Sequence, residues 1–418
     1  MKLLIVSHPS VTPINQQLFA EVEAHTQWDL TLVGPSNWVD DYGTVRGLER
    51  WPDFEGDLRA IPVFGSGNIP LHVYRTTFWR LLRDVQPDAL YVHNEPYAAS
   101  TAQLWLANRW SGVQAAFGFY AAQNIVKKYP IPFRWTEQAV YRASQFSFPC
   151  SETVLDTLRT KGYTGPATLL PLGIDPTLYA PSPRADQLRD DLRGDADVLF
   201  GYLGRITEEK GVPTMLRAMA QLRSSLDWRL AIVGTGDRTD AFRTLAAELG
   251  IADRLVWVGY VEHTEAPHYL SAFDVLVLPS ETQPTWKEQF GRVIVEALAC
   301  ETPVVGTNSG EIPRLLRRTE GGVIVEERNP TSLASGLQSL AESPQRRRRL
   351  AVQGAGYVRD HLTHRALAVQ FAEAIEQAVD VSASPNGDRA QSSAPSSATV
   401  ASRSTSNSKR APFSSADS

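Results

Sequence analysis

Short apolar runs alternate along the chain with longer amphipathic stretches, which is the pattern of parallel β-sheets joined by crossover helices. Each run has the length and continuous hydrophobicity of a buried strand. In the first half, the expected strands are residues 3–6, 30–33, 89–92, 113–117, 145–148 and 167–170. In the second half, they are residues 198–203, 229–233, 255–258, 275–278, 303–306 and 322–325. The pattern therefore predicts an α/β protein with two series of parallel strands.

The two series of strands predict two Rossmann-like, doubly wound domains, because 418 residues exceed what one hydrophobic core usually organises. We expect the first domain over residues 1–180 and the second over 184–362, on either side of a proline-rich stretch. One more helical pattern covers residues 365–379. Residues 382–418 are rich in Ser, Ala and Asn with few large apolar side chains, so we expect a disordered tail.

Two carboxylates, Glu288 and Glu296, are separated by seven residues where the strand 275–278 should lead into a helix. Open parallel sheets bind ligands beyond the carboxyl ends of their strands, so these side chains are expected at a ligand-binding edge. Eight helical steps of about 1.5 Å would separate them by about 12 Å, roughly the span from hexose to ribose in a sugar nucleotide. Taken alone, the pair is equally consistent with one loop carboxylate near a helix N-terminus and one solvated helix carboxylate.

A second charged segment, residues 204–211, also follows an expected strand and begins and ends with glycine. Arg205 can donate two hydrogen bonds to phosphate oxygens, and Lys210 adds a movable positive charge. The flanking glycines let the backbone approach a diphosphate closely. The alternative for this segment is surface ion pairing with Glu208 and Glu209.

Together these segments resemble the retaining glycosyltransferases of family 4, whose fold is called GT-B. Further motifs follow in the family's order: PLGIDPTLY at 171–179, VGTG at 233–236, ALACETPVVG at 297–306 and SGEIP at 309–313. The resemblance implies two Rossmann-like domains facing across a cleft. It implies transfer of a glycosyl unit from a nucleoside diphosphate sugar with retained configuration, without a metal or a cofactor. It also implies that the helix at 365–379 crosses back onto the first domain.

The resemblance assigns roles to the residues of the two charged segments. Arg205 and Lys210 are expected to stabilise charge on the leaving diphosphate, and Glu288 to contact the transferred sugar, which makes these three the expected catalytic residues. Glu296 is expected to accept hydrogen bonds from the ribose. The expected donor-binding residues are Gly204, Gly234, Gly236, Tyr260, Val261, Gln289, Phe290, Gly291, Arg292 and Glu296. Family members usually have glycine where Gln289 stands, so the sugar that fits this pocket stays open.

Acceptor contacts are expected from the first domain, in segments that follow its strands. The candidates are His8, Asn15, His93, Asn94, Gln123 and Lys127. Many relatives have a glycine pair in the segment that begins with His8, and a histidine where this chain has Gln123. Taken alone, His93 is equally consistent with a structural histidine.

The net charge and the cysteine content limit the classes of binding partner and the cellular compartment that we expect. A formal net charge of −5 argues against nucleic acid as a partner. Cys150 and Cys300 are the only cysteines and lie in apolar surroundings, which favours a reducing cytoplasm. The N-terminus becomes polar too early for a signal peptide, and no apolar run is long enough to span a membrane. We expect a cytoplasmic enzyme of polysaccharide, lipopolysaccharide or glycolipid synthesis whose membrane contact, if any, is peripheral at the inner face.

Three smaller motifs allow more than one interpretation. Asp195 and Asp197 form an Asp-x-Asp that precedes its strand, which predicts a turn and not a metal site. Residues 127–135 mix basic and aromatic side chains, as in a contact with a lipid-linked or anionic acceptor, or as in packing under a loop. Residues 346–349 are four arginines, typical of a solvated helix face or of a patch that binds a membrane or partner.

Other functions stay open at this point. A dinucleotide oxidoreductase could use Gly234 and Gly236, although Thr239 occupies the third glycine position, and binding of NAD(H) but not UDP or GDP would favour it. A sugar nucleotide epimerase of the same fold would form product without an acceptor. A noncatalytic sugar nucleotide binding protein would bind without turnover.

Overall fold

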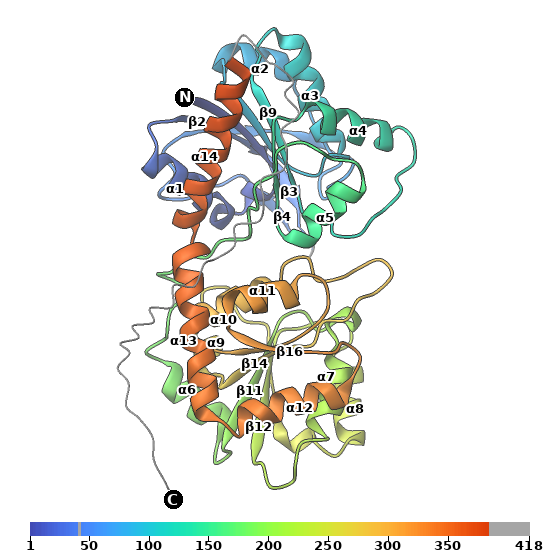
Figure 1. The fold of residues 1–418 in the computed structure, drawn as a ribbon, viewed down its shortest axis with the longest axis vertical. Helices are drawn as coiled ribbons and strands as arrows, with labels where there is room; N and C mark the ends of the chain where they lie inside the picture. The colour runs from blue at the N-terminus through green and yellow to red at the C-terminus, as the bar shows by residue number, and fades with distance from the viewer. Residues whose placement is uncertain (41–42, 384–418) are drawn as a thin grey trace, which may run out of the picture. The chain divides into compact units, whose positions relative to one another are not determined.

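The computed structural model describes residues 1–40 and 43–383, which form two α/β lobes, each built on one six-stranded parallel sheet (Figure 1). The strand orders are β10-β9-β8-β1-β2-β5 in the first lobe and β13-β12-β11-β14-β15-β16 in the second. In each sheet the chain adds strands on one side of the first strand and then on the other, which is the doubly wound arrangement. The predicted fold class is confirmed. The expected tail lies outside the described residues, apart from residues 382 and 383 at the end of the last helix.

The first lobe places its most apolar strand, β1, near the centre of the sheet. Leu3, Leu4 and Ile5 are fully buried, because helices cover both faces and the strand reads as a continuous apolar run. The strands of this sheet are β1 (Lys2–Ser7), β2 (Asp29–Pro35), β5 (Asp57–Ile61), β8 (Ala89–His93), β9 (Ala116–Ala121) and β10 (Phe146–Pro149). Two short antiparallel pairs are β3 (Asn37–Val39) with β4 (Val45–Gly47) and β6 (Val63–Phe64) with β7 (Val73–Tyr74). The helices are α1 (Gln17–His25), α2 (Phe78–Val85), α3 (Ala99–Ser111), α4 (Phe133–Ala143) and α5 (Glu152–Thr160).

The second lobe repeats this architecture with β11 as its first strand. The strands are β11 (Val198–Leu203), β12 (Trp228–Val233), β13 (Leu255–Gly259), β14 (Val275–Leu278), β15 (Val304–Thr307) and β16 (Gly322–Val325). The helices are α6 (Ala185–Arg193), α7 (Val212–Met219), α8 (Thr239–Glu248), α9 (Ala266–Ala272), α10 (Arg292–Ala299), α11 (Ile312–Thr319), α12 (Pro330–Ala341) and α13 (Pro344–His361). Asp195 lies in the turn between α6 and β11, before the strand, as predicted.

The last helix, α14 (His364–Ala383), is longer than the expected 365–379 and packs on α1 in the first lobe (Figure 1). Its Phe371 is buried in the core of that lobe and stacks on Phe148 with ring centroids 4.8 Å apart. The two chain segments that join the lobes are hydrogen-bonded to each other, because Ile174 accepts from His364 N at 3.1 Å and donates to Leu362 O at 3.0 Å. None of the helices in the described ranges combines the length and apolar character needed to cross a membrane.

Two expected strands differ from the structure, and one strand of the first sheet was not expected. The strand predicted at 113–117 is β9, which begins three residues later, where a fully buried run replaces the polar Gln114. Residues 167–170 are not a strand: Thr168 N and Leu170 N donate to β10 carbonyls at 3.0 and 2.9 Å, but the pairing goes no further. β5 was not predicted, because its partly exposed, mixed sequence DLRAI lacks the apolar signal.

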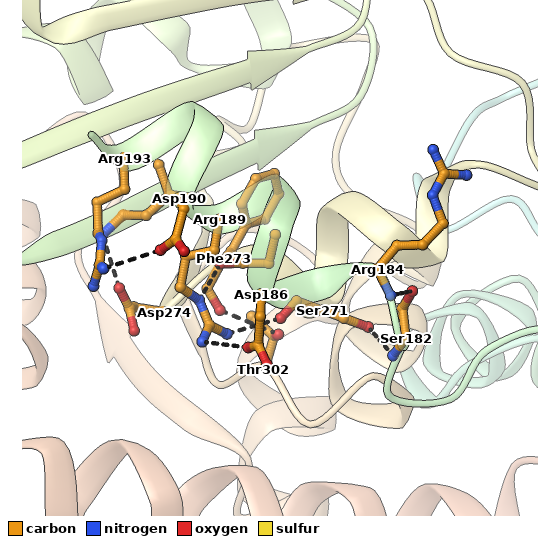
Figure 2. A network of polar contacts seen from close by, with 12 residues as sticks. Ser182, Arg184, Asp186, Arg189, Asp190, Arg193, Ser271, Phe273, Asp274 and Thr302 are labelled. Carbon is orange, nitrogen blue, oxygen red and sulfur yellow. Dashed lines mark hydrogen bonds and ion pairs between the residues drawn. The ribbon is translucent and has the colours of Figure 1, made fainter.

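A polar network at the amino ends of β11 and β14 joins α6 to the rest of the second lobe (Figure 2). Arg189 on α6 donates to Ala272 O at 2.8 Å and to Ser271 O at 3.0 Å. These carbonyls end α9 and have no partner within that helix, so the guanidinium caps it. Asp274, at the start of β14, accepts from Leu199 N at 2.8 Å. The network fixes the end of the sheet opposite to its carboxyl edge.

We predict that Arg189→Ala lowers the free energy of unfolding by about 2 kcal/mol, because two buried carbonyls lose a charged donor. Urea unfolding followed by circular dichroism measures this change. Arg184→Ala is the matched control: Arg184 pairs with Glu265 at 3.2 Å in an exposed position, so its loss should cost at most about 0.5 kcal/mol. Equal effects of the two substitutions would contradict the capping role.

Candidate active site

Loops that follow β11, β12 and β14 converge at the carboxyl edge of the second sheet. The loop after β11 meets the loop after β12 through Ile206 N, which donates to Thr235 O at 2.9 Å. It meets the loop after β14 through Glu281 N, which donates to Glu209 O at 2.9 Å. Gly211, at φ +67°, completes this packing, because a Cβ there would lie 1.9 Å from Pro279 O. The two charged segments singled out in the sequence are therefore neighbours.

Glu288 and Lys210 form a direct ion pair at this edge. Lys210 Nζ lies 2.7 Å from Glu288 Oε2, and Ser280 Oγ donates to the same oxygen at 2.9 Å. Glu288 is only 9% exposed, so its charge needs these partners. The Lys210 ammonium also lies over the ring of Trp286, 4.7 Å from its centroid. The sequence reasoning missed Ser280 and Trp286, which carry no motif of their own.

Arg205 lies on the open side of the same loop. Its side chain is 54% exposed and forms an ion pair with Glu209 at 3.8 Å. The hydroxyl of Tyr202 donates to the Arg205 carbonyl. Burial raises the pKa of Tyr202, Glu288 raises it further and Arg205 lowers it, so both charges act on one hydroxyl. Arg205 and Lys210 thus lie on the same loop, with Lys210 in the interior and Arg205 facing solvent.

The helix that follows Glu288 starts later than the spacing argument assumed. α10 begins at Arg292 with Gly291 as its N-cap, so Glu288 lies in the preceding loop. The expected span of about 12 Å along one helix therefore does not apply to Glu288 and Glu296. Glu296 is on α10, buried, and pairs with Arg292 at 2.9 Å.

Glu296 is the centre of a second polar group on the same side of the lobe. The Tyr179 hydroxyl contacts the His263 ring at 3.0 Å. Burial raises the pKa of Tyr179, and the negative charge of Glu296 raises it further. Burial lowers the pKa of His263, against the opposing effect of Glu296. A carboxylate with neutral hydroxyl and imidazole neighbours can accept hydrogen bonds from a polyol such as ribose.

The glycine turn after β12 contacts the loops after β13 and β11. Gly234 N donates to Gly259 O at 2.7 Å, which links the turn to the loop after β13 that carries Tyr260 and Val261. Gly204 N donates to Val233 O at 3.0 Å, so the turn also contacts the Arg205 loop. The expected donor-binding residues therefore lie on adjoining loops at one sheet edge, apart from Arg292 and Glu296, which are on α10.

The first lobe contacts the backbone of Glu288. Asn124, which follows β9, donates its side-chain amide to Glu288 O at 2.8 Å. The same carbonyl accepts from Glu311 N at 3.1 Å. Gly310 makes this approach possible at φ +55°, because a Cβ there would lie 1.9 Å from Glu288 O. Two elements far apart in sequence therefore hold the catalytic candidate from opposite lobes.

Glu311 also caps a helix of the first lobe. Its carboxylate accepts from Thr153 N at 2.9 Å and from Glu152 N at 3.3 Å, at the N-terminus of α5. Arg314, one turn further on, pairs with Asp156 of α5 at 2.7 Å. Arg318 pairs with Glu152. The SGEIP motif thus connects the donor side of the site to α5.

A cavity of about 280 Å³ lies between candidate donor and acceptor residues. Asn15 and His93 line it from the first lobe, and Gln289, Phe290 and Arg292 line it from the second. The His93 ring stacks on Tyr120 with centroids 4.2 Å apart. Burial lowers the pKa of His93 to about 4, so its imidazole is neutral at neutral pH. The remaining lining is mostly apolar.

The other acceptor candidates do not line this cavity. His8 is buried against Trp38 and His72, with ring centroids 5.0 and 5.2 Å away. Asn94 donates to Ser100 Oγ at 2.8 Å and so stabilises its own loop.

Gln123 and Lys127 belong to the segment after β9 that also carries Asn124. The side chain of Gln123 accepts from Ile125 N at 2.9 Å. Lys127 is half-buried next to the exposed Val126.

Glu95 is a functional candidate that the sequence reasoning missed. Its Oε1 accepts from Ala122 N at 2.7 Å and from Gln123 N at 2.9 Å, and so holds the segment that leads to Asn124. Burial raises its pKa from 4.5 to about 7, although both backbone donors lower it. Its place directly after β8, next to His93 and Asn94, was the available signal.

The sequence profile of the glycosyl transferases group 1 matches residues 184–356, the part of the chain that contains Lys210, Glu288 and Glu296. Residues 184–356 belong to the glycosyl transferases group 1 family. The resemblance inferred from the motifs is confirmed.

Two curated relatives match about half of this chain. The GDP-mannose-dependent alpha-(1-6)-phosphatidylinositol monomannoside mannosyltransferase of Mycolicibacterium smegmatis is 30% identical over 209 residues, 49% of this chain and 54% of the relative. The D-inositol 3-phosphate glycosyltransferase of Thermobifida fusca is 33% identical over 198 residues, 45% of this chain and 44% of the relative. The chain thus spans about half the length of the curated relatives that it matches.

A solved structure of Anabaena Alr3699/HepE in complex with UDP resembles this chain over nearly its whole length. The match covers 90% of this chain and 100% of that chain, with a TM-score of 0.69 and 16% identity. At this identity the likeness shows the fold, which is the GT-B fold predicted from the motifs.

We predict that Glu95→Gln changes how stability depends on pH. The folded-state pKa of about 7 lies above the ordinary 4.5, so the stability contributed by Glu95 is complete below about pH 4.5 and is lost as pH rises through 7. The glutamine side chain keeps an oxygen for both backbone donors but does not titrate. As the pH rises from about 5 to about 8, the thermal midpoint of Glu95→Gln should therefore increase relative to that of the unaltered protein.

The control for this experiment is Glu248→Gln, because Glu248 lies on the surface of the second lobe at the end of α8, away from the Glu95 loop. Its pH profile should run parallel to that of the unaltered protein. A parallel profile for Glu95→Gln as well would contradict the raised pKa.

Proposed function

We propose that this protein is a retaining, metal-independent glycosyltransferase that moves a sugar from a UDP- or GDP-sugar to a glycan or lipid-linked acceptor. The observation that carries the proposal is the Lys210–Glu288 ion pair, 2.7 Å long, at the carboxyl edge of the second sheet. It joins a cation suited to a leaving diphosphate and a carboxylate suited to sugar hydroxyls in one place. Membership of the glycosyl transferases group 1 supports this assignment.

The donor is proposed to lie along the edge formed by the loops after β11, β12, β13 and β14. Glu296 accepts hydrogen bonds from the ribose, and Arg205 and Lys210 contact the diphosphate. We assign the backbone N–H groups at the start of α10 to the same diphosphate, because a helix N-terminus favours negative charge. The base then lies near Tyr260 and Val261.

The proposed reaction breaks the bond between the anomeric carbon and the β-phosphate oxygen. The acceptor hydroxyl oxygen forms the new bond on the same face, and its proton passes to the departing phosphate. Negative charge grows on the diphosphate as the bond breaks, so Arg205 and Lys210 act most strongly in the transition state. Glu288 positions the sugar, because its second carboxylate oxygen is not used by Lys210 or Ser280.

The acceptor is proposed to enter the 280 Å³ cavity that Asn15 and His93 line from the first lobe. Gln289 and Phe290 line its other side, so an acceptor hydroxyl there adjoins the proposed sugar position. A site for a second substrate favours transfer over epimerisation, which needs none. The names of the relatives include a phosphatidylinositol monomannoside and an inositol phosphate, so both lipid and soluble acceptors occur among them.

We predict that Lys210→Ala and Glu288→Ala each lower transfer at least about 100-fold, because charge on the diphosphate or the position of the sugar is no longer controlled. UDP-glucose and GDP-mannose are screened first for the donor that raises the thermal midpoint, since a ligand of the folded state stabilises it. Release of nucleoside diphosphate from that donor is then measured with a panel of glycans and lipid extracts.

A double variant distinguishes a loss of stability from a loss of transfer activity. Each single substitution leaves one charge without its partner and should lower stability by about 3 kcal/mol. Lys210→Met combined with Glu288→Gln removes both charges, so it should regain stability but not transfer. Arg223→Ala, which removes an exposed cation paired with Glu342, is the control with normal transfer. Near-normal turnover by both single variants would refute the proposal.

A further inference from the structure

The segment that enters α4 exposes large apolar side chains to solvent. Val126, Ile131 and Trp135 are 53%, 61% and 66% exposed, within ten residues of one another. Single exposed apolar residues are common on protein surfaces, but a cluster that includes tryptophan marks an interaction site. Packing beneath a loop, one of the two interpretations of residues 127–135, is therefore wrong for Ile131 and Trp135. Figure 1 shows this loop standing away from the first sheet beside α4.

Positive charge surrounds the exposed apolar side chains. Lys128, Arg134 and Arg142 are exposed, and Lys127 is half-buried. In the part of the chain that the structure describes, these four cations form no ion pair. The nearest carboxylate on α4, Glu137, is buried and pairs with Lys161.

Helix α4 separates its buried and exposed sides clearly. Glu137, Val140 and Tyr141 face the lobe. Arg134 and Arg142 are exposed near the two ends of the helix. Each end of the helix thus exposes a cation, and Trp135 is exposed next to Arg134 in the first turn.

The position of this segment relates it to the candidate active site. Ile125 and Val126 line a groove together with Lys287 and Arg314 of the second lobe. Asn124, which lines the same groove, donates to Glu288 O at 2.8 Å. The exposed segment therefore begins at a groove whose wall includes Asn124, a direct contact of Glu288.

We propose that residues 126–142 form a docking surface for the anionic face of a lipid bilayer. Trp135, Ile131 and Val126 enter the headgroup region, and Lys127, Lys128, Arg134 and Arg142 contact anionic headgroups. Docking presents the groove at Asn124 to lipid-linked molecules in the membrane. That last step depends on the proposed function, whereas binding to the bilayer does not.

A bilayer fits this surface better than an acidic protein does. Protein interfaces bury their aromatic anchors in fitted pockets, whereas the apolar anchors here stand on a protruding loop and the first turn of α4, with cations around them. Tryptophan beside lysine and arginine is the composition of segments that lie at a membrane–water boundary.

The test is co-sedimentation of the full-length protein with vesicles, without any sugar nucleotide. Vesicles of phosphatidylcholine mixed with phosphatidylglycerol should bind the protein, and vesicles of phosphatidylcholine alone should bind much less. Raising the salt from 0.1 to 1 M shortens the screening length from about 10 to about 3 Å and should release the protein. Because no donor is present, the result is independent of whether sugar transfer occurs.

Two variants and two controls locate the surface. Lys128→Ala with Arg134→Ala should weaken binding about 25-fold, at about fivefold per cation. Ile131→Ser with Trp135→Ser should also weaken it, and the weakened binding should remain salt-sensitive. Arg348→Ala with Arg349→Ala and Val352→Ser make matched changes at exposed positions of α13 and should bind normally.

Failure of the unaltered protein to bind anionic vesicles would overturn the proposal and leave a protein partner as the occupant of this surface. Normal binding by both 126–142 variants would also overturn it. Loss of binding in the α13 control, with normal binding by the other variants, would assign the membrane contact to the arginine cluster 346–349 instead.

Discussion

A carboxylate as buried as Glu288 is stable in its charged form only if the fold supplies a cation and hydrogen-bond donors at fixed positions. Lys210 and Ser280 meet this requirement, and both are held by backbone contacts between the loops after β11 and β14. Glu209 O accepts from Glu281 N, and Gly211 packs on Pro279. The ion pair therefore depends on adjacent strands in the second sheet. It fixes both charged groups at the carboxyl edge of that sheet.

The backbone carbonyl of Glu288 accepts hydrogen bonds from both lobes. Asn124 donates from the first lobe and Glu311 N from the second, while the Glu311 side chain caps α5 of the first lobe. A movement of one lobe against the other would thus change the hydrogen bonds to the backbone of Glu288. In this arrangement the proposed sugar position and the contact between the lobes are one structural unit.

The architecture was largely predictable from sequence because buried parallel strands are continuous apolar runs, and β5, which is partly exposed, was the strand that lacked this signal. Arg205, Lys210, Glu288 and Glu296 could be singled out because each follows a strand of one sheet and carries charge. Their partners could not be found in this way. Asn124 is 164 residues from Glu288, and Lys210 is 78 residues from it, so these contacts arise only from the tertiary packing of distant loops. The start of α10 was misjudged because Gly291 as N-cap places Glu288 outside the helix.

The central claim is that Arg205 and Lys210 neutralise a diphosphate beside Glu288. The most direct measurement is a crystal structure of the protein with bound UDP or GDP. The account predicts phosphate oxygens within hydrogen-bond distance of both cations and a ribose on Glu296. A nucleotide bound with its diphosphate away from both Arg205 and Lys210 would contradict it.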